Sequence, residues 1–371
     1  MYYITSFFIL LYWIVLILTL YSFFGYPLLL GVFYLFKRKF KQERPEYTPK
    51  VSLVIIAGND EKTIAAKLEN AAHFEYPKEK LEIIVATVNS SDNTRKIVED
   101  HFATGVKLLF QADKAGRNLA INACVSEAGG SVIIITDASS VIEKFSIKNL
   151  ARHFVDAKVG LVAGNLEFSP GKDPFLSGEK LFVEHNRAIL SNSSKLKKIS
   201  RVNPELYAIR KADFHELLDN DVLDSTSVPV MYSVSGKACL FEPLALATKT
   251  LKATAEAYYE SRVNATIESL RAAKYLKELF HSRKYLTLIQ LLSHNILYGA
   301  CGGLLLLLFV FNLFILVKPG YVVLLSIQFL FYVAGALKLF GFFPYYMLFT
   351  SYANITGIVK LLKKEGIDGK S

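Results

Sequence analysis

The first clear pattern in the chain is a long, uninterrupted apolar run at its N-terminal end. No Asp, Glu, Lys or Arg occurs from Met1 to Phe36, and the basic segment KRKFK (Lys37 to Lys41) follows at once. Since a helix of about 20 residues crosses the hydrocarbon core of a bilayer, this run predicts a transmembrane anchor. A cleaved signal peptide would have a charged start, a shorter apolar core and a small-residue cleavage site, and none is evident. The basic cluster places the following chain in the cytoplasm by the positive-inside rule.

A similar pattern returns near the C-terminal end. No Asp, Glu, Lys or Arg lies between Lys284 and Lys318, and a second uncharged run follows. We predict membrane spans at 296–317 and 321–337, joined by a short turn. A third apolar run precedes a basic tail, and it is long enough to span, to re-enter or to lie in the interface. The positive-inside rule favours the last two alternatives, because two crossings already return the chain to the cytoplasm.

Between these ends, short apolar runs alternate with segments whose apolar residues recur at helical spacing. The runs KVSLVIIA, LEIIVATV, VKLLF and SVIIITD are rich in β-branched residues and predict strands. The segments EKTIAAKLENAAHF, TRKIVEDHF and NLAINACVSEA lie between them and predict helices. This order predicts an α/β domain with a mostly parallel sheet covered on both faces. In such sheets, ligands bind beyond the carboxyl ends of the strands.

The patterns divide the chain into six consecutive segments. The helical pattern before the C-terminal apolar runs is strongly basic, which suits a position against lipid phosphates. We expect a transmembrane anchor (1–36), a basic linker (37–49), the α/β domain (50–250), amphipathic basic helices at the membrane surface (251–295), C-terminal transmembrane or interfacial helices (296–362) and a tail (363–371).

Composition restricts the class of protein further. Of the 371 residues, 52% are hydrophobic, the mean hydropathy is +0.31 and the formal net charge is +10, which is more apolar and more basic than one soluble domain normally is. The positive charge clusters beside the apolar runs without any nucleic-acid-binding module, so a membrane is the expected partner and nucleic acid is not. The three cysteines form no CxxC pair and the histidines no HExxH motif, so zinc chemistry lacks support.

Polar residues stand where the predicted strands end. Asn59 and Asp60 follow the first strand, Asp92 lies in the loop after the second, and Asp137 ends the fourth. These residue types also cap helices and form turns, so Asp60 and Asp92 have a purely structural alternative. Their shared place at one edge of the sheet favours a ligand site.

The segment DKAGRNLAIN adds an arginine, Arg117, just before a predicted helix. An arginine there can bind a diphosphate bidentately, supported by the helix N-terminus. The alternative is a solvated surface cation. The sequence has neither GxGxxG nor GxxxxGK[ST], so the dinucleotide-binding and P-loop classes lack their fingerprints.

In their order and spacing, several fragments resemble the membrane-bound family 2 glycosyltransferases, which use nucleotide-diphosphosugars. The fragments are GYPLLL, VSLVIIAGNDEKTI, YPKEKLEIIVATVNSSDNT, GRNLAIN, IITDASS, LYAIRKADF, NDVLDS, ACLFEP and QLLSHNIL. The resemblance covers nearly the whole chain. It implies a Rossmann-like nucleotide-diphosphosugar transferase domain with a mostly parallel sheet, flanked by transmembrane helices.

The resemblance also implies roles for the strand-ending residues. Asp137 stands at the first acid of the family's DxD motif, where it would bind Mg²⁺ or Mn²⁺ together with the diphosphate of the donor. Contacts with the nucleotide sugar are implied for Asn59, Asp60, Asp92, Arg117 and Asp137.

Three further residues take implied roles around the acceptor. Asp224 corresponds to the first member of an acidic pair whose second member is the general base, and it is the candidate catalytic residue. Arg210 lies in a segment expected beneath the acceptor site, and Arg262 is the candidate for a basic motif that closes over the donor.

The chain departs from the family pattern at four positions of this site. The departures are Gly58 in place of an aromatic residue, and Val88, Ser139 and Ser225 in place of acids. A serine hydroxyl is a weaker metal ligand than a carboxylate, and Ser225 stands where the base would be. Asp224 supplies a base only if its loop is shifted by one residue.

The expected function is that of a hexosyltransferase-type glycosyltransferase in a bacterial-type inner membrane, with its catalytic domain in the cytoplasm. It would move a sugar from a UDP- or GDP-linked donor to a lipid-linked or polysaccharide acceptor. The alternative is a catalytically weakened or inert membrane scaffold that holds other glycan-assembly proteins together.

Overall fold

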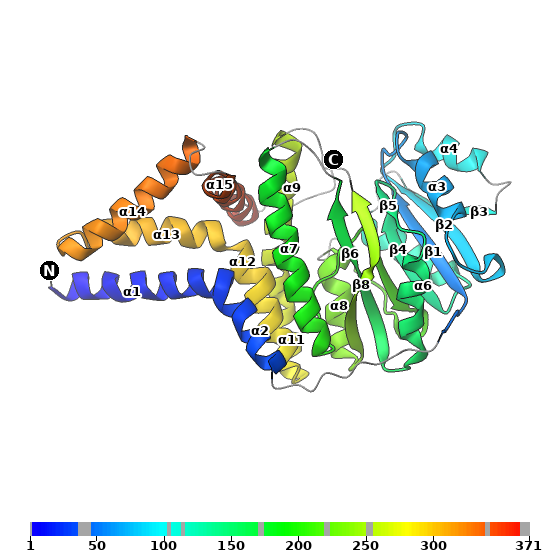
Figure 1. Cartoon of the computed structure of the whole chain (residues 1–371), viewed down its shortest axis with the longest axis horizontal. Coiled ribbons are helices and arrows are strands. Elements are labelled where there is room, and N and C mark those ends of the chain that lie inside the picture. Colours follow the sequence, from blue (N-terminus) through cyan, green and yellow to red (C-terminus); the bar gives the residue numbers. More distant parts are fainter. Residues whose placement is uncertain are drawn as a thin grey trace.

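The chain forms a sheet domain joined to an arm of apolar helices (Figure 1). This computed structural model describes residues 2–35, 46–101, 105–112, 116–169, 174–218, 223–249, 255–337 and 342–363. Helices α7 (Pro174–Lys195) and α9 (Ala255–Arg271) stand between the sheet and the arm. The arm contains α1 (Tyr2–Leu20), α13 (Cys301–Leu313) and α14 (Pro319–Ala336).

The described strands form one sheet in the order β3-β2-β1-β4-β7-β6-β8-β5. Strands β3, β2, β1 and β4 are parallel, β7 is antiparallel to both of its neighbours, β6 and β8 are parallel, and β5 is antiparallel to β8. The α/β fold with a mostly parallel sheet is therefore confirmed. The strands are β1 (Val51–Ala57), β2 (Leu81–Val88), β3 (Val106–Ala112), β4 (Val132–Asp137), β5 (Ser140–Ile142), β6 (Val159–Phe168), β7 (Tyr207–Arg210) and β8 (Ala238–Lys249).

Helices cover both faces of the sheet, as the continuous apolar runs in its central strands require. Every residue of β1 is buried. In β4, Val132 and Ile134 point into one core cluster, whereas Ile133 and Ile135 point into the other. The first face packs on α3 (Ile64–Ala72) and α6 (Ser146–Ala151), and the second on α5 (Arg117–Glu127) and α8 (Asp224–Val234).

The strand order creates a switch point between β1 and β4. The chain builds outward from β1 through β2 to β3, and then returns to place β4 on the other side of β1. Ile56 of β1 lies opposite Asp137 of β4, so the loops that follow these two strands leave the same edge side by side. A switch point of this kind is where open α/β sheets bind ligands.

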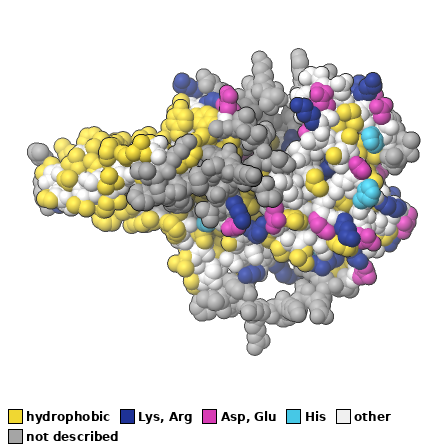
Figure 2. All heavy atoms as spheres, turned by 45° about the horizontal axis from the view of Figure 1, so that its top comes forward, with side chains coloured by type: hydrophobic (Ala, Val, Ile, Leu, Met, Phe, Trp, Pro, Cys, Tyr) yellow, Lys and Arg dark blue, Asp and Glu magenta, His cyan; other side chains and the backbone are white. Residues whose placement is uncertain are grey.

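Two described helices are long and apolar enough to cross a membrane. They span Tyr3–Val32 and Pro319–Ala336. A further candidate consists of two helical segments, Tyr285–Gly299 and Cys301–Leu313, which meet at a bend of 64°. Figure 2 shows hydrophobic side chains over the arm, whereas charged side chains gather on the rest of the visible surface.

The bend falls within the span expected at 296–317, which does not form a single straight helix. The chain turns at Ala300, and α13 alone has 13 residues, about 20 Å, which is short for a bilayer core. Close helix packing accounts for the turn. A Cβ on Gly299 would lie 2.7 Å from Ser269 Cβ of α9, and one on Gly302 would lie 2.4 Å from the carbonyl oxygen of Ser351.

Further helical elements complete the described part of the chain. They are η1 (Tyr21–Gly25), α2 (Tyr26–Leu35), η2 (Lys78–Lys80), α4 (Thr94–Asp100), η4 (Arg152–Val155), η5 (Lys211–Asp213), η6 (Ala272–Lys274), α10 (Tyr275–His281), α11 (Tyr285–Gln290), η7 (Leu291–Ile296), α12 (Leu297–Gly299) and α15 (Phe342–Leu362).

The start of β4 depends on a glycine that permits close backbone approach. A Cβ on Gly130 would lie 2.5 Å from the backbone nitrogen of Ser52, whereas one on Gly129 would meet first the flexible end of Lys50. We expect Gly130→Ala to destabilise the protein by about 1–3 kcal/mol and Gly129→Ala to cost much less. Unfolding of the two variants in detergent checks this, and equal stability of the two would contradict it.

Candidate active site

The loops after β1 and β2 are joined by hydrogen bonds into one unit. Asn59 adopts a left-handed backbone, with φ of 55°, and its side-chain oxygen accepts from the backbone N–H of Ser91 at 2.9 Å. The backbone N–H of Glu61 donates to the Asp92 carboxylate at 3.0 Å, and the Glu61 carboxylate accepts from the backbone N–H of Asn93 at 3.2 Å. The two loops therefore hold each other in position beside the switch point.

Two of the departures from the family pattern lie in direct contact within this unit. A Cβ on Gly58 would stand 2.7 Å from the carbonyl oxygen of Val88. No side chain fits at Gly58 unless the Val88 backbone moves away. The glycine at 58 therefore allows the backbone at Val88 to approach the loop after β1 closely, and an aromatic residue at 58 would prevent this contact.

Asp92 stabilises the backbone of its own loop, which is the structural role that turn-forming aspartates have. The Asp92 carboxylate accepts from the backbone N–H of Thr94 at 3.0 Å and from its hydroxyl at 2.5 Å. Desolvation raises the pKa of Asp92, but hydrogen bonds from Thr94, Glu61 and Ser90 outweigh it and lower the value to about 2. Nucleotide contact by Asp92 stays a prediction.

The Asp60 carboxylate is affected by the acids around it. Its oxygens accept from the backbone N–H of Gly58 at 2.8 Å and from the hydroxyl of Thr63 at 3.2 Å. Burial raises its pKa first, and the negative charges of Asp137 and Asp92 raise it further. Asp60 therefore lies close enough to Asp137 and to Asp92 for both charges to act on its carboxylate.

The central contact of the site is made by Arg117, the first residue of α5. Its Nε donates to Asp224 Oδ1 at 2.9 Å, its Nη1 donates to Asp137 Oδ1, and its Nη2 donates to the carbonyl oxygen of Pro204 at 3.1 Å. The side chain is only 17% exposed, so the surface-cation alternative is wrong. One guanidinium joins two acids that are far apart in the sequence.

Asp224 is enclosed completely. The residue is 0% exposed, and its second carboxylate oxygen accepts from the hydroxyl of Tyr207 at 2.6 Å. Arg117 and Tyr207 each donate a hydrogen bond to one of its two oxygens. In this structure neither oxygen is therefore free to take a proton from an acceptor substrate. The catalytic role of Asp224 stays a prediction, and what the geometry displays is an anchor for Arg117.

Asp137 keeps partial access to solvent and is flanked by cations. Its side chain is 22% exposed, and its Oδ2 lies 3.9 Å from Lys249 Nζ, which also pairs with Glu205 at 2.8 Å. Burial lowers the pKa of Lys249, but the charges of Glu205 and Asp137 raise it above its ordinary value. Asp137 therefore remains partly open to a ligand, unlike Asp224.

A buried lysine lies behind Asp137. Lys67 is 1% exposed, and its Nζ donates to the hydroxyl of Thr136 at 2.8 Å and to the carbonyl and hydroxyl oxygens of Ser140 at 2.7 and 3.1 Å. Burial lowers its pKa from 10.5 to about 7, although the charges of Asp137 and Glu205 act in the opposite direction. Lys67 is therefore a buried lysine behind this acid whose charged form is disfavoured by burial.

The expected place of Arg210 is wrong. Arg210 lies opposite Val132, at the start of β4, whereas Asp137 ends that strand about 16 Å away. Its guanidinium donates to the carbonyl oxygens of Val159, Phe154 and Asp156. Because β7 runs antiparallel to β4, the arginine at its end reaches the edge opposite the site, where it binds backbone.

Arg262 lies on α9 at the wall of a cavity next to the site. Its Nε donates to the hydroxyl of Tyr258 at 2.8 Å, and its guanidinium stands over the Tyr258 ring. Closure over a donor by Arg262 stays a prediction.

Sequence reasoning missed Lys67, Tyr207, Glu205 and Lys249. A signal existed for Lys67, because it shares the apolar face of α3 with Ile64, Leu68 and Ala71. A lysine on an apolar helix face must find polar partners in the core. The other three residues carry no comparable pattern, because only the folded sheet brings them to Asp137.

Residues 52–218 match the sequence model of Glycosyl transferase family 2. They form a family 2 glycosyltransferase domain. Asn59, Asp60, Asp92, Arg117 and Asp137 all lie inside the matched range, whereas Asp224 and Arg262 lie beyond it.

Individual relatives agree with this family. The chain is 35% identical over 130 residues to the "Probable glycosyltransferase YdaM" of Bacillus subtilis, covering 33% of this chain and 31% of that protein. It is 27% identical over 150 residues to a beta-monoglucosyldiacylglycerol synthase of Trichormus variabilis, covering 39% of this chain and 32% of that protein. The matched region spans about a third of the length of these curated relatives.

A solved structure shares the fold over nearly the whole chain. The mannosyltransferase PcManGT from Pyrobaculum calidifontis, in complex with GDP-Man and Mn²⁺, superposes with a TM-score of 0.74 at 20% identity. The likeness covers 96% of this chain and 100% of that one. At this identity it shows the fold, including helices outside the matched family domain.

The bridge made by Arg117 leads to a stability prediction. Arg117→Leu leaves Asp224 buried without its cation, so we expect a loss of about 3–5 kcal/mol in the free energy of unfolding. Adding Asp224→Asn should recover part of that loss, because the uncompensated charge is gone. As a control, Arg95→Leu removes an exposed pair with Glu99 and should change stability by less than about 1 kcal/mol. Denaturant unfolding in detergent measures the stability of all three variants. If Arg117→Leu loses no more stability than Arg95→Leu, the bridge is contradicted.

Lys67 gives a pH dependence with a definite sign. Since its folded pKa of about 7 lies below its ordinary 10.5, the unfolded chain binds the proton more readily between these values. This residue therefore makes stability rise with pH across that window, by at most about 1.4 kcal/mol per pH unit.

Lys67→Met isolates this contribution. The stability of the wild type minus that of Lys67→Met should increase from pH 7 toward pH 9, as measured by unfolding in detergent. A pH-independent difference would show that Lys67 is charged in both states.

Proposed function

We propose that the protein is a membrane-associated glycosyltransferase that moves a sugar from a nucleotide-diphosphosugar to a lipid-linked or glycan acceptor. The observation that carries the proposal is the convergence of Asp60, Asp137 and Arg117 at the switch point of a family 2 glycosyltransferase domain. The relatives support the substrate classes, since one is named a beta-monoglucosyldiacylglycerol synthase and one fold neighbour was solved with GDP-Man.

The reaction needs positive charge where the donor breaks. In glycosyl transfer, an acceptor oxygen attacks the anomeric carbon while the bond from that carbon to the diphosphate breaks, and the leaving diphosphate gains negative charge. Arg117 and Lys249 flank Asp137 with cationic groups at this place. In the proposal, Asp60 and the joined loops hold the nucleotide, and Arg117 with Lys249 faces the diphosphate.

A divalent cation fits this site only with help from the donor. Among the described residues, no group of three His, Cys, Asp or Glu side chains could hold a metal. Asp137 Oδ2 is the carboxylate oxygen that Arg117 leaves open, and Ser139 offers only a hydroxyl nearby in the chain. Mg²⁺ commonly binds through one or two carboxylates together with substrate phosphates, so Asp137 would hold it against the diphosphate and the ion would add further positive charge.

The membrane setting rests on the apolar arm. Two helices of sufficient length and apolarity lie on the same chain as the transferase domain, which supports an acceptor that is itself in the membrane. We further propose that the domain faces the cytoplasm of a bacterial-type cell, because the basic segment Lys37 to Lys41 directly follows the first apolar run.

A nucleotide-sugar screen tests the proposal. Purified wild-type protein should bind UDP or GDP in the presence of Mg²⁺ or Mn²⁺ and lose this binding in EDTA. With the matching donor it should release the nucleoside diphosphate, and Asp137→Asn should lower that rate about 100-fold or more. Asp100→Asn, an exposed acid at the end of α4, is the matched control and should behave as the wild type does.

The alternative of an inert scaffold makes the opposite prediction. Its support is the enclosed Asp224 and the serine at 225, which leave no described acid free in the place of the general base. Nucleotide binding without turnover of any donor, together with co-purification of other membrane proteins, would favour the scaffold and reject the enzyme.

A further inference from the structure

A cavity of about 230 Å³ lies where the sheet domain meets the helices of the arm. Its wall on the sheet side comes from the end of β6 and the loop 201–205, and its other walls come from α7, α9, η7, α12 and α15. The cavity is smaller than the roughly 300–1,000 Å³ of typical pockets for drug-sized ligands. Its size suits a headgroup and not a whole nucleotide sugar.

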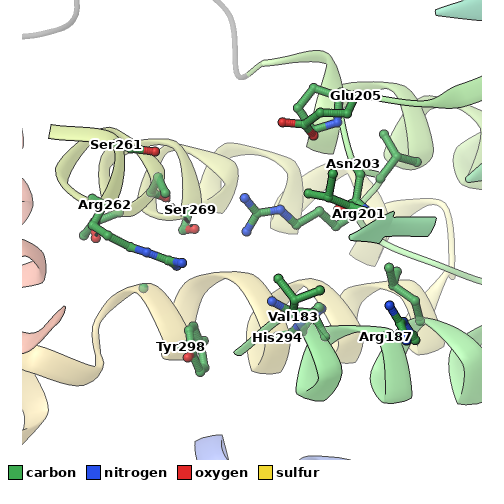
Figure 3. Close-up of a pocket in the computed structure, with 18 of the residues that line it drawn as sticks. Val183, Arg187, Arg201, Asn203, Glu205, Ser261, Arg262, Ser269, His294 and Tyr298 are labelled. Carbon is green, nitrogen blue, oxygen red and sulfur yellow. Dashed lines mark hydrogen bonds between the residues drawn. The ribbon is translucent and has the colours of Figure 1, made fainter. Parts of the chain in front are cut away.

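Arginine side chains enter this cavity from opposite sides. Figure 3 shows the guanidinium groups of Arg201, from the loop 201–205, and Arg262, from α9, pointing toward the same space. A third arginine of the lining, Arg187 on α7, is already held by Asn165 at 3.0 Å and by Glu167 at 2.9 Å. The cavity thus gathers positive charge where the sheet domain meets the helices that lead into the arm.

Arg201 is the least compensated of these side chains. Its guanidinium makes no hydrogen bond or ion pair with another residue in the described part of the chain. Burial lowers its pKa first and the neighbouring cation of Arg262 lowers it further, whereas Glu268 and Glu205 act the other way. The fold therefore bears an electrostatic cost to keep this cation at the cavity wall.

The nearby carboxylates are already engaged. Glu205 pairs with Lys249 at 2.8 Å, and Glu268 accepts from the backbone N–H of Leu223 at 2.8 Å. The hydroxyl of Thr350, which also lines the cavity, has no hydrogen-bond partner among the described residues. An anion with several acceptor oxygens would satisfy these donors.

The cavity adjoins the candidate donor site. Pro204 and Glu205 belong to its wall. The carbonyl oxygen of Pro204 accepts from Arg117, and Glu205 is bound by the same Lys249 that faces Asp137. A group bound in the cavity would therefore lie next to the place proposed for the donor diphosphate.

We propose that this cavity binds the phosphate group of a membrane-anchored acceptor, a lipid phosphate monoester, between Arg201 and Arg262. The proposal rests on the glycosyl transfer proposed above and names the acceptor class. The lipid source follows from the place of the cavity, whose far wall is built by helices that continue into the apolar arm.

Such an acceptor also accounts for the absent base. A hydroxyl acceptor must give up its proton to a general base, and here Ser225 stands in its place while Asp224 is enclosed. A phosphate monoester is largely doubly ionised at neutral pH. Its oxygen forms the bond to the anomeric carbon, the bond from that carbon to the donor diphosphate breaks, and the nucleoside diphosphate leaves with the electron pair. No proton has to be removed.

The test compares three probes on the purified full-length chain in detergent. The probes are geranyl phosphate, its alcohol geraniol and inorganic phosphate, and binding is measured by equilibrium dialysis. We expect geranyl phosphate to bind at least tenfold more tightly than either comparator, since only it combines the anion with an apolar chain. Equal binding of inorganic phosphate would reject the lipid source, and equal binding of geraniol would reject the anion site.

Variants of Arg201 provide the second part of the test. Arg201→Met should weaken geranyl phosphate about tenfold or more, the loss of a charge-assisted contact, and Arg201→Lys should recover part of it. The melting temperature of Arg201→Met should not fall, because a cation that lacks an ion-pair partner among the described residues is removed from the cavity wall. Arg95→Met, on an exposed part of α4, is the matched control. The proposal would be overturned if Arg201→Met bound geranyl phosphate as tightly as the wild type does. It would also be overturned if the variant lost binding only because its melting temperature fell.

Failure here is distinguishable from failure of the proposed function. Binding of UDP or GDP is measured separately and should be the same in Arg201→Met and the wild type. Absent donor binding in the wild type would reject the transferase whatever the cavity binds. Transfer of sugar to geraniol in preference to geranyl phosphate would retain the transferase and reject the phosphate acceptor.

Discussion

The arrangement of the candidate site depends on one guanidinium. Asp137 ends β4 and Asp224 begins α8, and two carboxylates brought together at a sheet edge would repel each other unless a cation lay between them. Arg117 supplies that cation with a planar, always charged fork, which a lysine could not reproduce at three acceptors. Because Asp224 is fully enclosed, its charge needs the cation of Arg117 for the fold to be stable, whatever part the bridge has in catalysis.

The same arginine ties together the two sides of the proposed reaction. Its third bond, to the carbonyl oxygen of Pro204, fixes the loop that forms one wall of the arginine-lined cavity. Lys249 makes a parallel connection, since it faces Asp137 on one side and Glu205 of that loop on the other. Any shift of Arg117 on donor binding would therefore be transmitted to the cavity wall through contacts that already exist.

Local patterns predicted β1, β2, β3 and β4 because strands buried on both faces are mostly apolar and β-branched, as KVSLVIIA and SVIIITD are, whereas the other four described strands carried no such clear pattern. They also predicted that Asp60 and Asp137 share an edge, since parallel strands carry their ends to the same side. Patterns failed where geometry depends on a partner distant in sequence. Arg210 was misplaced because the direction of β7 is not encoded locally, and the turn at Ala300 arises from close contacts of Gly299 and Gly302 with other helices.

The departures from the family pattern are not independent losses. Gly58 and Val88 form one close backbone contact, so the two changes belong to a single reshaping of the nucleotide loops. At the acceptor side, the serine at 225 accompanies an enclosed Asp224 and a cavity that keeps Arg201 at an electrostatic cost. A cation at a cavity wall without an ion-pair partner destabilises the fold, and a bound anion would compensate it. Arg201 at this wall, in a site without the expected base, therefore argues for a changed acceptor over a lost activity.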